Sequence, residues 1–426
     1  MSWVRVAGLA ASFTVATGAV VVLPFWLTST GCGSSGNASV PVFVPPFEGS
    51  GDGGHGVTTG SGDGGGPGSG TSQGASSSGA VGPSSSSGAV NASSSGAGTS
   101  STSSSSSAPA CTTPAMSGTV TGKAGSTSSV SRLVFAVVGD TRPTNEDDPS
   151  GYPTAIIDTI YKDIEAQNPH PVLTLATGDY QFSSTGSSST ASQQVPLYAA
   201  AMKYYSGPTF PAMGNHECGV SGSACSSDYN NCGPQNNGGA TPNYNAFMEY
   251  LLAPIGVTDQ STPYYSFNVN ATDNSWTAKF VITAANAWDS AQNSWLATVL
   301  GQSTTYTFVV RHEPSDADPA TCCTGTCPNA PGIAGVDALL ATNPYTLLIV
   351  GHTHDYKQGI ISPDTSPTVT FGNGGAPLTS SSYDYGYGIF AQRCDGAILV
   401  DEYDYKTNAK DPNFTIAVTP AGKYTH

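Results

Sequence analysis

Five short apolar segments each run directly into polar residues, and this repeated pattern limits what the chain can fold into. The segments are rich in Val, Leu, Ile, Phe and Thr and have the length of buried strands. They occupy residues 131–139, 171–177, 209–213, 305–310 and 345–350. In an open α/β sheet, ligands bind beyond the carboxyl ends of the strands. The pattern therefore predicts an α/β fold in which polar side chains meet at strand C-termini.

The residues that follow these segments belong to a few chemical types. Apolar residues at helical spacing in 153–167 predict a helix between the first two segments. A strand–helix–strand unit makes its two strands parallel and brings their ends together. His352 and His354 are two positions apart, so both rings can point to one side of an extended segment. The candidate site residues are Asp140, Asp179, Asn215, His216, His312, His352 and His354.

This set of side chains favours a metal site. Taken singly, an Asp after a strand is more often a turn residue. Together, two carboxylates, one amide oxygen and several imidazoles suit divalent or trivalent transition metals, whereas calcium prefers oxygen ligands. Six ligands are too many for one tetrahedral zinc. A carboxylate shared by two ions ~3.5–4 Å apart would use all of them.

The same residues lie in blocks that resemble a known family. Gly-Asp-Thr-Arg, Gly-Asp-Tyr, Gly-Asn-His-Glu, His-Glu-Pro and Gly-His-Thr-His occur in this order. They resemble the signature blocks of the calcineurin-like metallophosphoesterases, which include purple acid phosphatases and bacterial phosphodiesterases. The resemblance covers residues 131–405 and implies an α/β/β/α sandwich of two mixed sheets flanked by helices. It also implies hydrolysis of phosphate mono- or diesters by a hydroxide that bridges two metal ions.

The resemblance further implies a role for each residue. His216 would act near the leaving group, as a general acid or as an electrostatic stabiliser. The cofactors would be two ions of Mn, Fe or Zn, with the identity open. The implied ligands are Asp140 and His354 for the first metal, Asp179 as the bridge, and Asn215, His312 and His352 for the second.

Arg142 departs from the family pattern. The first block usually reads Asp-x-His, and a guanidinium cannot bind a metal. Arg142 could clamp the substrate phosphate, the first metal could bind with fewer ligands or with Tyr180, or the enzyme could be mononuclear. We favour a phosphate clamp beside an altered first site, which makes Arg142 a second catalytic candidate with His216. An ion pair of Arg142 with Glu146 or Asp147 is the alternative.

Three further features allow a structural or a functional interpretation. Glu217 could orient a ligand or cap a turn. Residues 372–375, Gly-Asn-Gly-Gly, resemble a glycine-rich segment that lines the site in the family. Tyr383, Tyr385 and Tyr387 could form a substrate wall, but we expect a half-buried strand edge. Phe182 stands where acid phosphatases carry a Tyr, which argues against that subgroup.

Composition divides the chain into four parts. Residues 1–31 read as a signal peptide or membrane anchor, and residues 32–130 as a flexible Ser/Gly-rich linker that buries too little apolar surface to fold. Residues 131–405 suit one catalytic domain, in which 368–372, 387–394 and 397–405 would form a closing β-meander. Residues 406–426 read as a tail of low order.

The N-terminus predicts export. Arg5 precedes an apolar stretch at 6–27, and the small residues before Cys32 resemble a bacterial lipoprotein cleavage site, although Ser29 stands where that pattern prefers Leu. We expect lipidation at Cys32, or else an uncleaved anchor, and a location in the bacterial periplasm or at the cell surface. The eight other cysteines suggest disulfides of open connectivity.

Charge narrows the range of partners. The formal net charge is −16, with 13 basic and 29 acidic residues, and no Lys/Arg cluster occurs. A nucleic-acid surface would need one. We expect a phosphorylated small molecule or other phosphoester as substrate, the membrane as partner through the N-terminus, and no protein partner. The alternative function is a metal-poor, catalytically decayed binding or scaffold module on a surface stalk.

Overall fold

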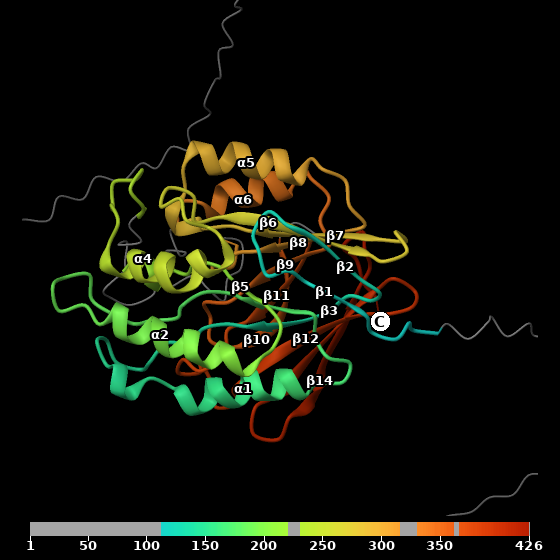
Figure 1. The fold of residues 1–426 in the computed structure, drawn as a ribbon, viewed down its shortest axis with the longest axis horizontal. Coiled ribbons are helices and arrows are strands. Elements are labelled where there is room, and N and C mark those ends of the chain that lie inside the picture. The colour runs from blue at the N-terminus through green and yellow to red at the C-terminus, as the bar shows by residue number, and fades with distance from the viewer. Residues whose placement is uncertain (1–111, 220–230, 316–329, 362–365, 426) are drawn as a thin grey trace, which may run out of the picture. The chain divides into compact units, whose positions relative to one another are not determined.

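The computed structural model of the protein describes residues 112–219, 231–315, 330–361 and 366–425. The predicted signal, Cys32 and residues 32–111 of the predicted linker lie outside them. Two mixed β-sheets face each other, and helices cover their outer faces (Figure 1). This confirms the predicted α/β/β/α arrangement. Among the described residues, no helix is both long enough and apolar enough to span a bilayer.

The first sheet has eight strands in the order β1-β2-β6-β7-β8-β9-β11-β10. Its centre is parallel, because β7, β8, β9 and β11 run in one direction. All side chains of β8 and β9 are buried, as expected for strands covered on both faces. The strands are β1 (Gly118–Thr119), β2 (Thr127–Val130), β6 (Tyr265–Ala271), β7 (Thr277–Ile282), β8 (Tyr306–Val310), β9 (Leu347–Val350), β10 (Tyr356–Ile361) and β11 (Ser366–Phe371).

The second sheet has seven strands in the order β15-β14-β13-β12-β3-β4-β5. Here β3, β4 and β5 are parallel, and an antiparallel meander continues from β12 to β15. The strands are β3 (Val134–Val138), β4 (Leu173–Ala176), β5 (Thr209–Pro211), β12 (Gly386–Gln392), β13 (Ile398–Asp404), β14 (Ala409–Val418) and β15 (Tyr424–Thr425).

Helices lie on both outer faces (Figure 1). α5 and α6 pack on the first sheet, where Leu296 and Val336 share an apolar cluster with Val309. α1 and α2 lie on the side of the second sheet, with Ile157 and Ile160 of α1 buried. The helices are α1 (Thr154–Ala166), α2 (Ala191–Ala201), α3 (Asn215–Cys218), α4 (Pro242–Phe247), α5 (Ser290–Leu300) and α6 (Ile333–Leu340), with shorter turns at η1 (Pro149–Gly151), η2 (Met202–Tyr204), η3 (Met248–Leu252), η4 (Ala253–Ile255) and η5 (Ala285–Ala287).

Aromatic rings fill the space between the two sheets. Phe135 on β3 meets Phe280 on β7 and Phe308 on β8 edge to face, at centroid distances of 5.3 and 5.0 Å. Phe135 also stacks on Phe390 of the neighbouring strand at 4.6 Å. Burying one such side chain contributes roughly 1.5–3 kcal/mol. This core holds the two sheets together and so fixes where their strand ends lie.

Several sequence expectations need correction. Residues 368–372 do not join the closing meander, because β11 pairs with β9 and β10 in the first sheet. β10 was not predicted. The fold also extends past both predicted domain boundaries: β1 and β2 precede residue 131, and β14 and β15 lie in the stretch expected to be a tail. Directly after α4, the chain is π-helical from Met248 to Leu252.

Candidate metal centre

The predicted ligands come together at the ends of strands from both sheets. β3, β4 and β5 of the second sheet end beside β8 and β9 of the first. Asp140 follows β3, Asp179 follows β4, and Asn215 opens α3 after β5. His312 follows β8, and His352 follows β9. The hydrogen bond from His312 Nδ1 to the carbonyl oxygen of Thr177 (2.9 Å) ties the two sets of strand ends together.

Four of these residues have unusual backbone conformations. Asp140, Asp179, His352 and His354 have φ values of 55°, 58°, 72° and 48°. Non-glycine residues rarely adopt this left-handed region, and such strain concentrates at functional sites. Gly178 makes close packing possible, since a Cβ there would lie 2.6 Å from His312 Nδ1. The backbone is therefore bent to turn these side chains toward one point.

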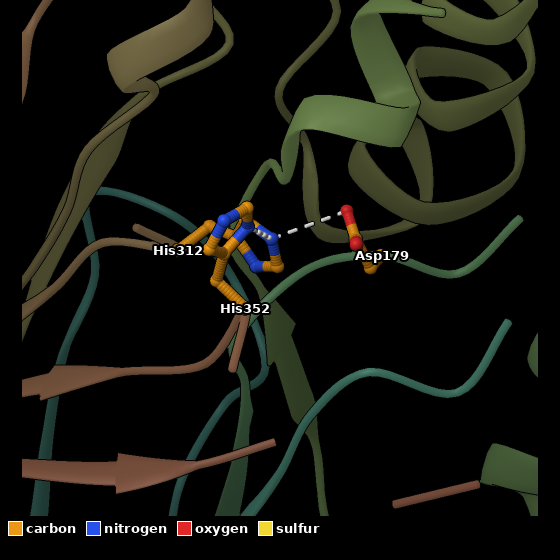
Figure 2. A group of neighbouring side chains, drawn as sticks. All are labelled: Asp179, His312 and His352. Carbon is orange, nitrogen blue, oxygen red and sulfur yellow. Dashed lines mark hydrogen bonds and ion pairs between the residues drawn. The ribbon is translucent and has the colours of Figure 1, made fainter. Parts of the chain in front are cut away.

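One ligand set consists of four converging atoms. Asn215 Oδ1 lies 3.0 Å from His312 Nε2 and 3.1 Å from His352 Nδ1. The two ring nitrogens are 3.2 Å apart, and His312 Nε2 is 3.2 Å from Asp179 Oδ1. Figure 2 shows the rings of His312 and His352 edge to face beside the Asp179 carboxylate. Such a cluster of acceptor atoms is what the predicted second metal site requires.

The hydrogen bonding of His312 suits a metal ligand. Its Nδ1 must donate to the carbonyl of Thr177, so Nε2 is the atom that faces the site. Burial acts to lower the pKa of His312, but Asp179 and then Asp140 raise it well above its usual value. A metal ion at Nε2 would displace the proton that these carboxylates favour.

A second ligand set shares Asp179. Asp140, Asp179 and His354 bring one ligand atom each within 4.8 Å of one another. His354 Nδ1 donates to the carbonyl of Pro377 (2.7 Å), and its Nε2 lies 3.5 Å from Asp140 Oδ1. Burial lowers the pKa of His354 to about 4, which favours the neutral form that binds metals. This set matches the predicted first site.

The surroundings of Asp140 also fit a metal ligand. Its Oδ2 accepts a hydrogen bond from the backbone N–H of His352 at 2.8 Å. Its Oδ1 is buried and has no hydrogen-bond partner among the described residues. A buried carboxylate oxygen without a partner is costly, and a cation would satisfy it. The residues present thus fit a pair of metal ions that share Asp179.

Arg142 faces this cluster. Its Nε lies 3.7 Å from Asp179 Oδ2, and its guanidinium carbon lies 4.8 Å from the ring centre of Phe182. The predicted alternative, an ion pair with Glu146 or Asp147, is wrong: Asp147 Oδ1 instead accepts from Ser183, Ser184 and Thr190. Tyr180 is no replacement ligand either, because its hydroxyl donates to the carbonyl of Ala176 or Ala212.

Four of the predicted ligands, Asp179, Asn215, His352 and His354, line a pocket of about 500 Å³. Arg142 is the only Lys or Arg among the described residues that line it. His216 also lines it, with its ring against Phe182 and Nε2 3.7 Å from Asp179 Oδ2. Burial lowers the pKa of His216 to about 3, although Asp179 acts in the opposite direction. Burial thus works against the proton that a general acid needs, and that role stays a prediction.

Glu217 supports the backbone at Asp179 and caps a turn as well. Its Oε2 accepts from the backbone N–H groups of Asp179 (2.9 Å) and Gly214 (2.8 Å). Its Oε1 accepts from the N–H of Tyr180 at 2.9 Å. One buried side chain therefore fixes both the loop after β4 and the start of α3.

The glycine-rich segment at 372–375 lies behind the first ligand set. A Cβ on Gly372 would come within 2.8 Å of Asp140 Oδ2 and 2.9 Å of His354 N. The residue directly after this segment also holds Asp140, whose carbonyl accepts from the N–H of Ala376 at 2.7 Å. Tyr387, by contrast, is fully buried in β12, between β13 and β3, and bonds to Asn408 and Gln167, so it forms neither a substrate wall nor the expected half-buried strand edge.

Sequence reasoning missed several supporting groups. Arg311 is fully buried, pairs with Asp337 at 2.8 Å and donates to the carbonyl of Glu313 at 2.7 Å, so it shapes the loop that carries His312. In the sequence, the signal for this role of Arg311 was its position directly before His312. The carbonyls of Thr177 and Pro377 orient two histidines, and a backbone carbonyl leaves no signal in the sequence.

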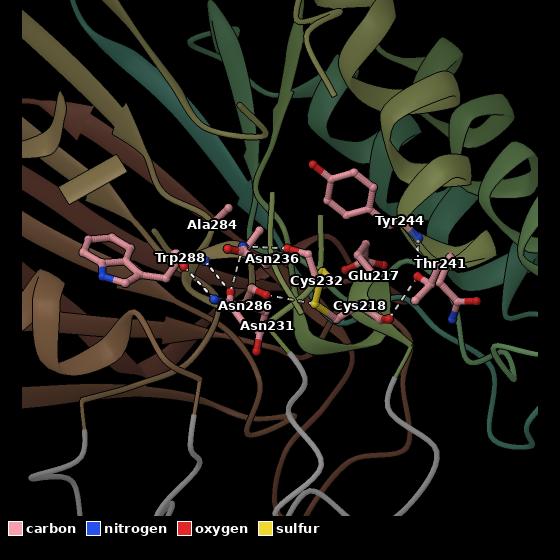
Figure 3. The surroundings of a disulfide bond; sticks show 12 residues. Glu217, Cys218, Asn231, Cys232, Asn236, Thr241, Tyr244, Ala284, Asn286 and Trp288 are labelled. Atoms are coloured by element: carbon pink, nitrogen blue, oxygen red, sulfur yellow. Dashed lines mark hydrogen bonds between the residues drawn. A yellow bond between two sulfur atoms is a disulfide. The ribbon is translucent and has the colours of Figure 1, made fainter. Parts of the chain in front are cut away.

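A disulfide anchors α3. Cys218, at the end of α3, is bonded to Cys232. Figure 3 shows this bond beside Asn286, whose carbonyl accepts from the N–H of Cys232 at 2.9 Å. The side chain of Asn286 donates in turn to Glu313. Of the other predicted disulfide cysteines, Cys111, Cys225, Cys322, Cys323 and Cys327 lie outside the described residues.

Known structures resemble this chain only distantly. A purple acid phosphatase from yellow lupin (Lupinus luteus) seeds is 15% identical, with a TM-score of 0.46 over 66% of this chain and 53% of that one. This chain thus spans about half of the lupin enzyme. GAP50, the anchor in the inner membrane complex of Plasmodium, is 14% identical with a TM-score of 0.43, over 69% and 90% of the two chains. A dimetal phosphatase from Danio rerio is 9% identical with a TM-score of 0.44, over 69% and 99%.

Family membership is established by the sequence profile. No curated protein matches the chain. The profile described as calcineurin-like phosphoesterase matches residues 133–356, more than half of the 426 residues. This range contains every ligand of the two sets. The chain therefore belongs to the calcineurin-like phosphoesterase family.

Proposed function

We propose that the protein hydrolyses phosphate esters with metal ions held by the two ligand sets. The observation that carries this proposal is the convergence of buried ligand atoms from two sheets on Asp179, which both sets share. When bound, the metal ions would coordinate phosphate oxygens, make a water molecule more acidic and offset the negative charge that develops during attack. Mn, Fe and Zn are the candidates, because the ligands mix carboxylate, amide and imidazole.

The chain itself would position the substrate. Arg142 has a buried Nε without a hydrogen-bond partner among the described residues, and it lines the pocket. A guanidinium there can donate to non-bridging phosphate oxygens. The ring of Phe182 packs against the guanidinium of Arg142 and contacts the ring of His216. His216 can offer an N–H hydrogen bond to an oxygen of the ester.

The experiment is metal content together with turnover. We expect the purified full chain to bind transition metal and to hydrolyse a generic phosphomonoester or phosphodiester. Asp179→Asn should abolish hydrolysis and lower the metal content, because Asp179 belongs to both sets. Asp158→Asn, on α1 and away from the pocket, is the matched control and should change neither. If no metal binds and neither ester is hydrolysed with added Mn, Fe or Zn, the scaffold alternative replaces the enzyme.

We also propose that the protein is exported and lipid-anchored through Cys32. Support comes from the apolar stretch after Arg5 and from the disulfide in the catalytic domain, since disulfides persist in oxidising compartments. Cell fractionation tests this. The full chain should fractionate with membranes and Cys32→Ala should not carry lipid; recovery of both in the cytoplasm would reject the proposal.

A further inference from the structure

Arg142 occupies the position where the family pattern predicts a histidine ligand, and this makes the two ligand sets unequal. The second set gathers atoms of Asp179, Asn215, His312 and His352 at separations of 3.0–3.2 Å between neighbours. The first set has Asp140, Asp179 and His354 only. Beside this smaller set stands a permanent positive charge instead of a fourth ligand.

The guanidinium is held in place. Its Nε lies 3.7 Å from the bridging Asp179, its Nη1 donates to the carbonyl of Pro143 at 3.3 Å, and the Phe182 ring covers one face. The side chain is only 16% exposed, so solvent and salt screen its charge weakly. A cation entering the first set would therefore meet a nearby positive charge, in addition to having one ligand fewer.

We propose that Arg142 makes metal binding at the first set depend on a phosphate group. The guanidinium opposes a metal ion at Asp140, Asp179 and His354, and a phosphate bound to the guanidinium offsets that charge. The second set would load first and tightly, and the first set would load together with the phosphate group. This inference rests on the proposed function and deepens it, because the substrate becomes part of the first metal site.

Thermodynamic linkage makes the effect reciprocal. If phosphate raises the affinity of the first set for metal, then metal at that set must raise the affinity for phosphate by the same factor. The coupling depends on one charge, because no other Lys or Arg is among the described residues that line the pocket. Removal of this one charge should therefore uncouple the two binding events.

The experiment is a Mn²⁺ titration of the full chain by calorimetry, with and without inorganic phosphate. We expect wild type to bind one equivalent tightly and a second weakly, and phosphate to tighten the second by roughly 10-fold or more. In Arg142→Gln, the second equivalent should bind more tightly than in wild type when phosphate is absent, and phosphate should have a much smaller effect. His354→Ala should remove the second equivalent, which assigns it to the first set.

A matched control is Arg393→Gln, which removes an exposed arginine paired with Asp395 and should leave both equivalents and the phosphate effect unchanged. The inference is overturned if wild type binds two equivalents equally tightly without phosphate. It is also overturned if Arg142→Gln does not tighten the second equivalent, or if phosphate acts equally on Arg142→Gln and wild type, since phosphate would then act on the metal alone. The proposed function fails on a different result, namely no metal bound and no ester hydrolysed.

Discussion

Glu217 is a single buried side chain that holds the backbone of two loops at the site. It accepts three hydrogen bonds from the N–H groups of Asp179, Tyr180 and Gly214. In Glu217→Gln, one oxygen becomes an NH₂ group that faces N–H donors. We expect the free energy of unfolding to fall by about 1–3 kcal/mol, and metal affinity to fall 10–100-fold, a loss typical of groups that support ligands.

Urea unfolding and metal titration of the Glu217→Gln variant would measure both effects. The exposed Glu146→Gln is the control and should behave as wild type. Unchanged metal affinity in Glu217→Gln would mean that the Asp179 loop keeps its position without these three hydrogen bonds.

Glu402 should give the protein a pH-dependent stability. Burial raises its pKa to about 8, Asn373 acts against this by donating at 2.9 Å, and Asp411, Asp404 and Asp384 add to the rise. Between the unfolded pKa of 4.5 and the folded value of about 8, the folded protein keeps a proton that the unfolded chain has lost. The free energy of unfolding should therefore decrease as pH rises, by at most about 1 kcal/mol per pH unit.

Glu402→Gln keeps an oxygen for Asn373 and removes the charge. We expect urea unfolding of this variant to show a flatter pH profile than wild type, and greater stability than wild type at about pH 8. The exposed Glu249→Gln should keep the wild-type profile. Parallel profiles for wild type and Glu402→Gln would show that Glu402 is already ionised in the folded protein at neutral pH.

At the scale of elements, α3 needs support from outside itself. It is a helix of four residues, too short to be stable alone, yet it carries Asn215, His216 and Glu217. The Cys218–Cys232 disulfide ties its end to the loop that contacts η5, and it closes a sequence separation of 14. A loop of this size predicts a stabilisation of about 3 kcal/mol.

We therefore expect the double variant Cys218→Ala, Cys232→Ala to unfold at lower urea concentration and to bind metal at the second set more weakly. Metal titration distinguishes the two effects, because a merely destabilised variant regains full metal affinity under strongly native conditions. Wild-type stability together with wild-type metal affinity would contradict the assigned role of the disulfide.

The ligands could be predicted from sequence because each directly follows a buried strand. Local apolar runs were enough to locate Asp140, Asp179 and His312, and the resemblance to the family blocks then implied their roles. Strand pairing joins residues that are far apart in the sequence. The residues around 368–372 therefore did not indicate that this segment pairs in the first sheet. β14 was missed because Lys410, Asp411, Pro412 and Asn413 interrupt its apolar pattern. The sequence alone could not show which carboxylate lies near Arg142, because that depends on how the folded chain brings distant residues together.

At the scale of the whole molecule, the metal centre lies where the strand ends of two sheets meet. β3 and β4 bring Asp140 and Asp179, and β8 and β9 bring His312 and His352. A metal bound between them would join the two sheets at one end of the shared core. Metal binding should therefore stabilise the entire catalytic domain and not only the loops around the site.

We expect chelation to lower the melting temperature of the full chain. At a metal concentration of 100 Kd, binding to the folded state alone adds about 2.7 kcal/mol, which corresponds to roughly 4 °C for a domain of this size. The physical reason includes Asp140, whose buried Oδ1 has no hydrogen-bond partner among the described residues. Calorimetry with and without a chelator measures the shift, and re-addition of Mn or Zn should reverse it. Asp179→Asn should show little or no shift, because both ligand sets lose their shared member. A wild-type melting temperature that the chelator leaves unchanged would mean that the two sheets are held at this end by protein contacts alone.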